Sequence, residues 1–256
     1  MTDTSSLHPQ APDVSFVIPA LNEAASLPDL IARLRAAVED RFGFEIVVVD
    51  DGSRDGTPDV VLAERTQDER VRLVRNRFNA GQSAAIHNGT MHASGRVICT
   101  LDGDGQNPPE DVLRVCRPLL NDPPEKLGLV AGQRVGRQDT ASKKLASRFA
   151  NWVRSRLLKD QTRDTGCGLK AFRRDAFLAL PFFNHMHRYL PALFRAAGWQ
   201  VELVDVSHAA RTAGQSNYSN WQRGLVGAVD LFGVLWLLKR RKRAEGDEVF
   251  APGEVR

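Results

Sequence analysis

Residues 45–53 read Glu45-Ile46-Val47-Val48-Val49-Asp50-Asp51-Gly52-Ser53. The unbroken run of branched apolar residues is typical of a parallel strand that is buried on both faces. The polar residues that follow are common turn formers, so we expect the strand to end near Val49. This stretch therefore predicts a buried strand with acidic side chains just beyond its carboxyl end.

Apolar runs and helical patterns alternate along the first half of the chain. We expect further strands at 14–18, 71–74 and 97–101, and helices at 27–38, after Pro58 and at 83–92. Ser26 with Asp29 resembles a capping box at the start of the first helix. The alternation predicts an α/β fold with a Rossmann-like, mostly parallel sheet and helices on both faces. Farther along we expect a basic helix at 142–158, a loop at 164–168, a strand at 201–206 and an apolar helix at 224–238.

Three polar clusters fall where predicted strands end: Asn22-Glu23, Asp50 to Ser53, and Asp102-Gly103-Asp104. Ligands of such sheets bind beyond the carboxyl ends of the strands, so we expect the clusters to meet at one edge. The third cluster could be an ordinary Asp-Gly turn. However, two carboxylates this close raise each other's pKa unless a positive charge lies between them. Oxygen ligands of this kind suit Mg²⁺ or Mn²⁺.

Composition places the chain among ordinary globular proteins, with 42% hydrophobic and 26% charged residues. The three cysteines form no CxxC pair, which indicates reduced thiols and a cytoplasmic location. Residues 1–12 are polar, so we expect no signal peptide there.

The segment from Arg134 to Arg174 is strongly basic, with twelve Lys and Arg residues and three acidic residues. No nucleic-acid-binding motif accompanies this charge, so phosphate-bearing small ligands or anionic lipid fit it better than nucleic acid.

Ordered motifs make the chain similar to a known family. The motifs at 19–23, 49–55 and 102–110 resemble those of the family-2 glycosyltransferases with the GT-A fold. Within that family the chain looks most like the dolichyl- or polyprenyl-phosphate sugar transferases. That narrower resemblance rests on Gly132-Gln133-Arg134, on the loop at 164–168 and on the segment at 208–218. It covers roughly residues 14–238.

The resemblance implies a site for a nucleotide sugar of the GDP-mannose or UDP-glucose type. Its expected residues are Pro19, Leu21 and Glu23 for the nucleoside, Asp51 and Asp50 for the base, and Asp102, Gly103 and Asp104 for the diphosphate. Asp102 and Asp104, with Gln106 as a further oxygen ligand, would hold Mg²⁺ or Mn²⁺ against the leaving diphosphate. Each residue also has a structural alternative: a helix N-terminal acid for Glu23, turn residues for the Asp50 pair, and a solvated loop for Gln106.

The acceptor side has two alternatives. A lipid phosphate is already an anion near neutral pH, so it needs cations rather than a general base. The expected phosphate-binding residues are Arg134, Arg211, Ser216 and a basic residue among Lys143, Lys144 and Arg148. A hydroxyl acceptor would instead need a base, for which Asp164 is the catalytic candidate. We expect no catalytic role for His185, His187 or His208.

The domain organisation follows from these patterns. We expect flexible tails at 1–12 and 244–256, a catalytic domain at 13–219, and an amphipathic helix with a basic run at 220–243. Residues 224–238 contain Asp230 and fall short of the roughly 20 residues that a membrane span needs. The helix either packs on the core or lies in the membrane surface through Trp221, Leu225, Phe232, Leu235 and Trp236.

The leading hypothesis is a metal-dependent, inverting glycosyltransferase that moves a sugar onto a polyprenyl or dolichyl phosphate at the cytoplasmic face of the membrane. The first alternative is transfer to a sugar or protein hydroxyl, with Asp164 as the base. The second is a non-catalytic scaffold that binds a partner protein, such as a membrane protein, through residues 221–236.

Overall fold

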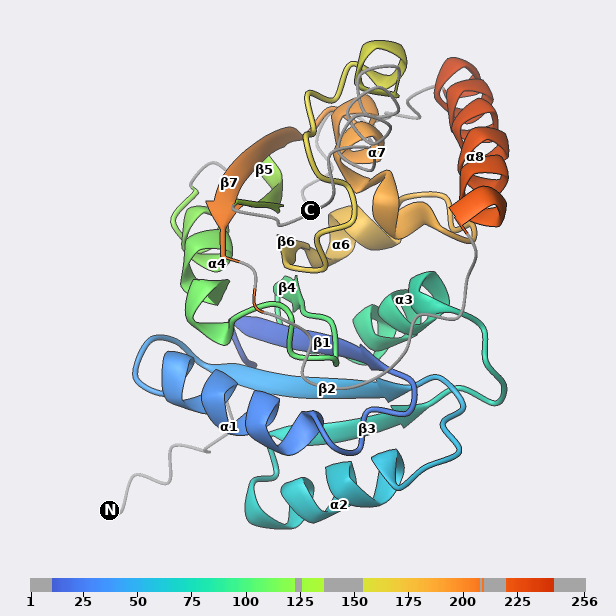
Figure 1. Cartoon of the computed structure of the whole chain (residues 1–256). Helices are drawn as coiled ribbons and strands as arrows, with labels where there is room; N and C mark the ends of the chain where they lie inside the picture. The colour runs from blue at the N-terminus through green and yellow to red at the C-terminus, as the bar shows by residue number, and fades with distance from the viewer. Residues whose placement is uncertain (1–10, 123–125, 136–153, 208, 210–219, 242–256) are drawn as a thin grey trace, which may run out of the picture.

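The computed structural model describes residues 11–122, 126–135, 154–207, 209 and 220–241, with only the backbone described for 220–226. One mixed sheet organises these residues, in the strand order β3-β2-β1-β4-β6-β5-β7 (Figure 1). The strands are β1 (Val14–Ala20), β2 (Phe44–Asp50), β3 (Val71–Arg75), β4 (Val97–Thr100), β5 (Leu127–Arg134), β6 (Lys170–Arg173) and β7 (Gln200–Val206). Only β6 runs antiparallel to its neighbours, and the other described pairs are parallel.

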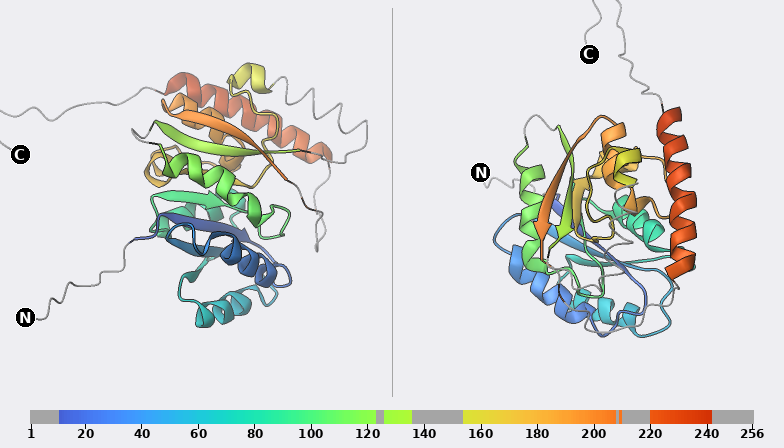
Figure 2. Two further views of the ribbon diagram at one scale, coloured as in Figure 1. Left: turned by 90° about the vertical axis from the view of Figure 1, so that its left-hand side faces the viewer. Right: turned by 45° about the horizontal axis from the view of Figure 1, so that its top comes forward.

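Helices cover both faces of this sheet (Figure 2). The helices that lie within the described residues are α1 (Leu27–Val38), α2 (Thr57–Gln67), α3 (Gln82–His92), η1 (Pro109–Asp111), α4 (Val112–Leu120), α6 (Arg174–Leu178), η2 (Met186–Arg188), α7 (Leu190–Ala196) and α8 (Asn220–Arg240). Helices α1 and α4 pack in one hydrophobic core, and α3, α6, α7 and α8 pack in the other. The predicted α/β class is therefore confirmed.

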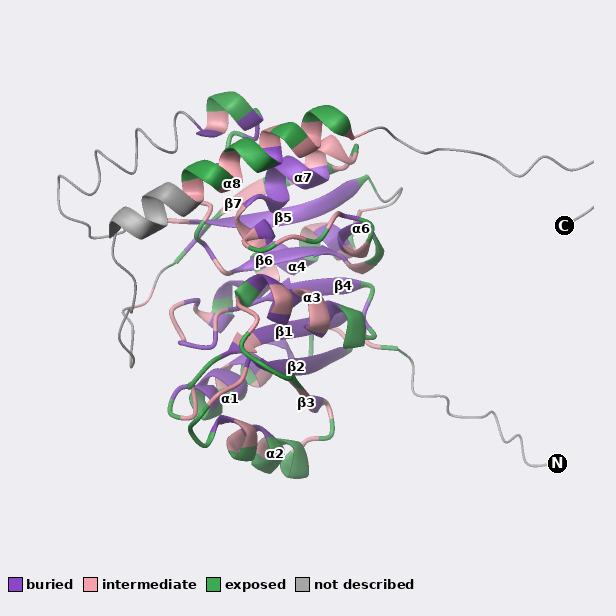
Figure 3. Ribbon diagram, turned by 90° about the vertical axis from the view of Figure 1, so that its right-hand side faces the viewer, coloured by how far each residue is buried: buried purple, intermediate pink, exposed green. Residues whose placement is uncertain are grey.

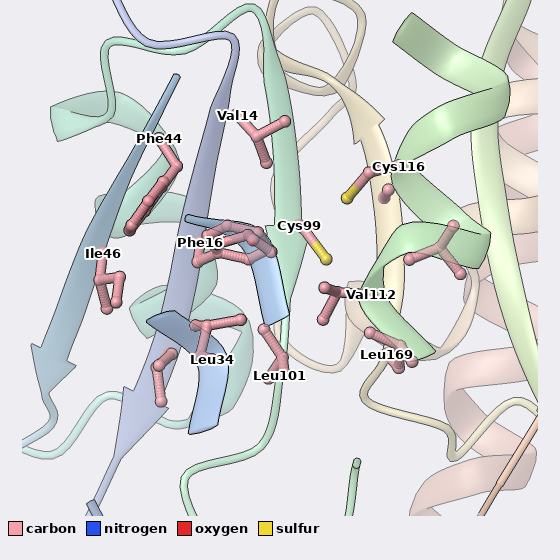
Figure 4. Close-up of a cluster of buried hydrophobic side chains, with 14 of the residues drawn as sticks. Val14, Phe16, Leu34, Phe44, Ile46, Cys99, Leu101, Val112, Cys116 and Leu169 are labelled. Atoms are coloured by element: carbon pink, nitrogen blue, oxygen red, sulfur yellow. The ribbon is translucent and has the colours of Figure 1, made fainter. Parts of the chain in front are cut away.

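The strand sequences explain why the sheet has two cores. In β1, Phe16 and Ile18 face the core beneath α1, while Val17 faces the core beneath α3. Figure 4 shows the first of these cores, where Phe16 lies close to Leu34 of α1. Every residue of β2 is buried, as its apolar run predicts. A strand that is covered on both faces has no polar position to alternate with.

One local prediction is wrong, and strand β6 was not predicted. The capping box is absent, because the Ser26 side chain makes no cap to α1. The Ser26 hydroxyl instead lies 2.8 Å from the carbonyl oxygen of Gly103 and 2.8 Å from Oε2 of Glu23. Strand β6 is the second difference. It has only four residues, two of them basic, so it lacks the long apolar run that marks the other central strands.

Helix α8 is longer than the predicted 224–238 and packs by one side only. Val234 is 2% exposed in the second core, whereas Phe232 and Trp236 are 70% and 62% exposed (Figure 3). Leu235 packs against the core, which corrects its expected place at the membrane surface. Asp230 also points inward, with Oδ2 lying 2.8 Å from Nδ1 of His185. In the part of the chain that the structure describes, no helix has the length and apolar character to cross a membrane.

Gly89 provides a test of how closely α3 approaches the sheet. A Cβ at this position would collide with a methyl of Val17 and would lie 2.8 Å from a methyl of Val49. We expect Gly89→Ala to lower the free energy of unfolding by about 1–3 kcal/mol through overpacking. Chemical denaturation measures this change.

The matched control is Gly233→Ala in α8, where a Cβ would meet nothing within 4 Å. There, relief of the glycine entropy cost should stabilise the protein by about 0.5–1 kcal/mol. Equal effects of the two substitutions would contradict the packing described here.

Candidate active site

The loops that follow β1 and β2 are joined by hydrogen bonds at one edge of the sheet. The backbone N–H of Asn22 donates to the Ser53 hydroxyl at 2.9 Å, and its side-chain oxygen accepts from the N–H of Arg54 at 2.8 Å. Asn22 adopts a φ of 59°, a left-handed conformation that asparagine tolerates better than most residues. Glu23 is tied in through its N–H, which donates to Thr57 at 2.9 Å. The two predicted nucleoside loops are thus neighbours.

Pro19 and Leu21 lie at the same edge. Pro19 is half-buried near the end of β1, and Leu21 is 42% exposed just beyond it. An exposed leucine beside polar loops is available for an apolar contact, as expected for a residue that lines a nucleoside site. Their binding role stays a prediction.

The two acids at the end of β2, Asp50 and Asp51, are buried, and other groups of the protein already donate hydrogen bonds to both. Asp50 accepts the N–H of Ser53 at 2.9 Å and pairs with Nε of Arg75 at 3.2 Å. Asp51 accepts from the Asn76 amide at 2.6 Å and from the N–H groups of Ala80 and Gly81 at 3.0 and 2.8 Å. A carboxylate offers about four acceptor positions, so these three bonds leave room for one more donor. Asp51 could therefore still meet a base while it shapes the loop before α3.

The Asp102-Gly103-Asp104 motif lies directly against the β1 loop. A Cβ on Gly103 would stand 3.1 Å from the Pro19 carbonyl oxygen and 3.4 Å from Cγ of Glu23. Glycine thus permits the close approach, and the Ser26 hydroxyl holds it by bridging Gly103 and Glu23. The three clusters predicted to converge are therefore brought together.

Asp102 is electrostatically strained. Burial, and next the Asp104 carboxylate, raise the pKa of Asp102 to about 6, although Lys170, Arg134 and Gln82 act in the opposite direction. Gln82, at the start of α3, donates to Oδ1 of Asp102 at 2.8 Å. A bound divalent cation would relieve this strain, because it replaces repulsion between the carboxylates by attraction.

The donor set fits Mg²⁺ or Mn²⁺ held jointly with a diphosphate. Asp102 and Asp104 supply carboxylates, and the described residues contain no group of three or more His, Cys, Asp or Glu side chains that could hold a metal alone. Metals of this kind commonly combine one or two carboxylates with substrate phosphates. The N–H of Gln106 donates to Asp104 at 3.1 Å, and its carbonyl accepts from Ala209 at 3.1 Å. Its role as a metal ligand stays a prediction.

Arg134 and Asp164 form a two-pronged ion pair, with Nε–Oδ2 and Nη2–Oδ1 distances of 2.6 and 3.0 Å. Burial opposes ionisation of Asp164, but the hydrogen bond and charge of Arg134 outweigh it and lower the pKa of the carboxyl. Gln133 supports the pair, since its Oε1 accepts the N–H groups of Arg163 and Asp164, each at 2.9 Å. The motifs at 132–134 and 164–168 thus form one unit.

Several predicted acceptor residues lie outside the described residues: Lys143, Lys144, Arg148, Arg211 and Ser216. Within the segment 208–218 the structure describes Ala209. Its backbone N–H donates to the carbonyl oxygen of Gln106, which lies two residues after Asp104. Of the histidines, His185 bonds Asp230 and His187 lies 2.7 Å from the Ser83 hydroxyl.

Sequence reasoning missed two residues of this site, Gly168 and Lys170. A Cβ on Gly168 would collide with the Asp102 carboxylate, so any other residue there would force this carboxylate to move. Lys170, at the start of β6, is 4% exposed and interacts electrostatically with Asp102 and Asp164. The sequence offered a signal for Lys170, which lies among the apolar residues Leu169, Ala171 and Phe172. Burying a charge in such surroundings is costly unless that charge has a partner.

The raised pKa of Asp102 predicts a pH-dependent stability. Folding lifts its pKa from 3.8 to about 6, so the folded protein binds more protons and loses stability as the pH rises from about 4 to about 6. Asp102→Asn, which can still accept from Gln82, should therefore stabilise the ligand-free protein above pH 6 by on the order of 1 kcal/mol, and little at pH 4. Urea denaturation at several pH values measures this.

The control is Asp40→Asn, at an exposed position, for which we expect no change at any of these pH values. A destabilising Asp102→Asn at pH 8 would show that the carboxylate is not strained.

Comparisons with known proteins show the family and the fold of the chain. Residues 15–180 match the family described as Glycosyl transferase family 2. The chain is 39% identical over 209 residues to an undecaprenyl-phosphate 4-deoxy-4-formamido-L-arabinose transferase of Pseudomonas syringae pv. syringae (strain B728a), covering 80% of this chain and 60% of the relative. A protein of the same description from Salmonella enteritidis PT4 is 36% identical, over 80% of this chain and 62% of the relative. The chain thus spans about three-fifths of these relatives' length.

Solved structures share the fold. Glucosyl-3-phosphoglycerate synthase from Mycobacterium tuberculosis, in complex with Mn²⁺, uridine diphosphate and phosphoglyceric acid, superposes with a TM-score of 0.67 at 21% identity, over 94% of this chain and 84% of that one. A mannosyltransferase from Pyrobaculum calidifontis, in complex with GDP-mannose and Mn²⁺, gives 0.64 at 22% identity, over 92% and 66%. The predicted GT-A fold is confirmed, and with the matched sequence family the conclusion is plain: the chain belongs to glycosyl transferase family 2.

Proposed function

We propose that the chain transfers a sugar from a nucleotide sugar to the phosphate of a polyprenyl phosphate, such as undecaprenyl phosphate. One observation supports this proposal above all. The Asp102-Gly103-Asp104 motif packs against the loop after β1, and its Asp102 interacts electrostatically with Arg134 of the Arg134–Asp164 pair. The names of the relatives support the choice of acceptor.

On the donor side, the loops after β1 and β2 would enclose the nucleoside, with Leu21 as the apolar contact and Glu23 toward the ribose. The Asp102 and Asp104 carboxylates would hold Mg²⁺ or Mn²⁺. When bound, the cation supplies positive charge to the diphosphate that leaves. Gln82 donates to the Asp102 carboxylate, and Gly168 leaves the space that this carboxylate occupies.

On the acceptor side, the ion pair favours a phosphate over a hydroxyl nucleophile. Asp164 is held ionised by Arg134, and its lowered pKa makes it a weak acceptor of protons. A phosphate monoester needs no such base, because its oxygens are already anionic near neutral pH. Direct attack of that oxygen on the anomeric carbon accounts for the expected inversion of configuration.

A transfer assay tests this function. Purified protein, Mn²⁺, radiolabelled UDP- or GDP-sugars and undecaprenyl phosphate should give a labelled lipid product. Asp104→Asn should lower the rate about 100-fold or more, since it removes a charge that holds the cation, whereas Asp40→Asn should be neutral. No lipid product with any common donor would refute the proposal.

The same assay separates the two acceptors. With a lipid phosphate, Arg211→Ala should impair transfer more than Asp164→Asn. Asp164→Asn abolishing transfer while Arg211→Ala only weakens binding would instead favour a hydroxyl acceptor. If the wild type bound no nucleoside diphosphate in calorimetric titrations, the scaffold alternative would be favoured.

We also propose that α8 contacts the cytoplasmic surface of a membrane that holds the acceptor. Its outward side carries Val229, Phe232 and Trp236, all at least 62% exposed, followed by exposed Lys239 and Arg240. Asp230 is turned inward onto His185, so no acid interrupts this side between residues 227 and 241. Exposed aromatics next to basic residues are typical of interfacial helices.

Vesicle sedimentation tests the membrane contact. Replacing Val229, Phe232 and Trp236 together by serine should weaken binding to anionic phosphatidylglycerol vesicles by about tenfold or more, because each side chain contributes on the order of 1 kcal/mol at the interface. Binding of the wild type should also fall with added salt. Leu62→Ser, at a 48% exposed position on α2, is the control. Equal vesicle binding by the triple variant would refute this contact.

A further inference from the structure

Lys170 lies on β6, between β4 and β5 in the sheet, and the transfer reaction proposed above assigns it no role. In the antiparallel ladder it pairs with Thr100 of β4 and with Ala131 of β5. Thr100 lies two residues before Asp102, and Ala131 lies three residues before Arg134. Lys170 is therefore paired with both of the strands that lead to the site, β4 before Asp102 and β5 before Arg134.

The Lys170 ammonium is buried and under-satisfied. The residue is 4% exposed, and its Nζ donates to the carbonyl oxygen of Cys167. An ammonium has three N–H groups to donate. Among the residues that the structure describes, no carboxylate forms an ion pair with Lys170 and no second acceptor is within hydrogen-bond distance of it. A buried ammonium with one hydrogen-bond partner destabilises the protein unless a further group accepts its remaining N–H groups and balances its charge.

The charges around Lys170 indicate what that partner is. Burial is the dominant influence and lowers the pKa of the lysine; Cys167, Asp102 and Asp164 act to raise it, and Arg134 acts to lower it further. The charge of Arg134 is already balanced by the two-pronged pair with Asp164. Of the two cations that interact with Asp102, Arg134 and Lys170, the lysine is thus the one whose charge the protein leaves less compensated.

We propose that the Lys170 ammonium binds a phosphate oxygen of a substrate in the transfer site, between Asp102 and the Arg134–Asp164 pair. Both substrates of the proposed function carry phosphate: the donor as a diphosphate and the acceptor as a monoester. This inference rests on that function. Lysine suits the position because it meets phosphate as a compact charge and needs no fixed two-pronged geometry.

The test compares Lys170→Met, which keeps the length and removes the charge, with Lys170→Arg, which keeps the charge. Lys126→Met, at an exposed position just before β5, is the control. Calorimetric titrations use two probes separately: UDP or GDP with Mn²⁺, and geranyl phosphate as a soluble prenyl phosphate. Thermal unfolding without ligand is measured for each variant.

We expect Lys170→Met to weaken one probe by about tenfold or more, Lys170→Arg to weaken it less, and Lys126→Met to change neither. Loss confined to the nucleotide assigns Lys170 to the donor diphosphate, and loss confined to geranyl phosphate assigns it to the acceptor. The ligand-free Lys170→Met protein should unfold at the same or a higher temperature, because an under-satisfied buried charge is removed. A merely structural lysine predicts a lower temperature.

Unchanged affinity of Lys170→Met for both probes would overturn the proposal, as would equal weakening of both together with a lower unfolding temperature. If Lys170→Met does not fold, Lys170→Gln takes its place and is judged by the same criteria. A wild type that binds neither probe contradicts the proposed function itself, and the role of Lys170 with it.

Discussion

The antiparallel pairing of β6 between β4 and β5 is the constraint on which the site depends. An antiparallel strand enters the sheet at the edge where its parallel neighbours end, so the loop at 164–168 must lie at the ligand edge. The Thr100 hydroxyl holds that loop by donating to the carbonyl of Gly168 at 2.6 Å. A parallel strand in this position would bring Asp164 and Lys170 to the opposite edge, away from Asp102.

Glu45 and Asp102 show how a structural carboxylate differs from one in the site. Loss of contact with water, taken by itself, acts to raise the pKa of both carboxyls. In Glu45, hydrogen bonds from Ser15, the Ser94 N–H and Arg72 outweigh burial and lower the pKa. In Asp102 burial has the largest influence and the strongest charge effect comes from another carboxylate, Asp104, so the pKa rises. The protein thus satisfies an acid that supports the fold and leaves one strained where a cation is expected, a pattern typical of functional sites.

Helix α8 is joined to the same packed unit as the site. His185 bonds Asp230 of α8, and two residues on, His187 contacts Ser83 at the start of α3. The residue before Ser83, Gln82, is the one that donates to Asp102. The side of α8 that faces outward and the acidic motif are therefore linked through packed residues, which is consistent with the proposed membrane-bound acceptor.

The parallel half of the fold and the three polar clusters could be read from sequence, because long apolar runs and turn residues are local signals. The apolar run from Ile46 to Val49 determined a doubly buried strand, and the residues after it determined a ligand edge. Tertiary structure alone decided the rest. The place of the short strand β6, the pairing of Arg134 with Asp164 and the inward turn of Asp230 all depend on contacts between residues distant in the chain, or on which side of a helix packs. No local pattern encodes these contacts, since they arise only when the strands take their order in the sheet.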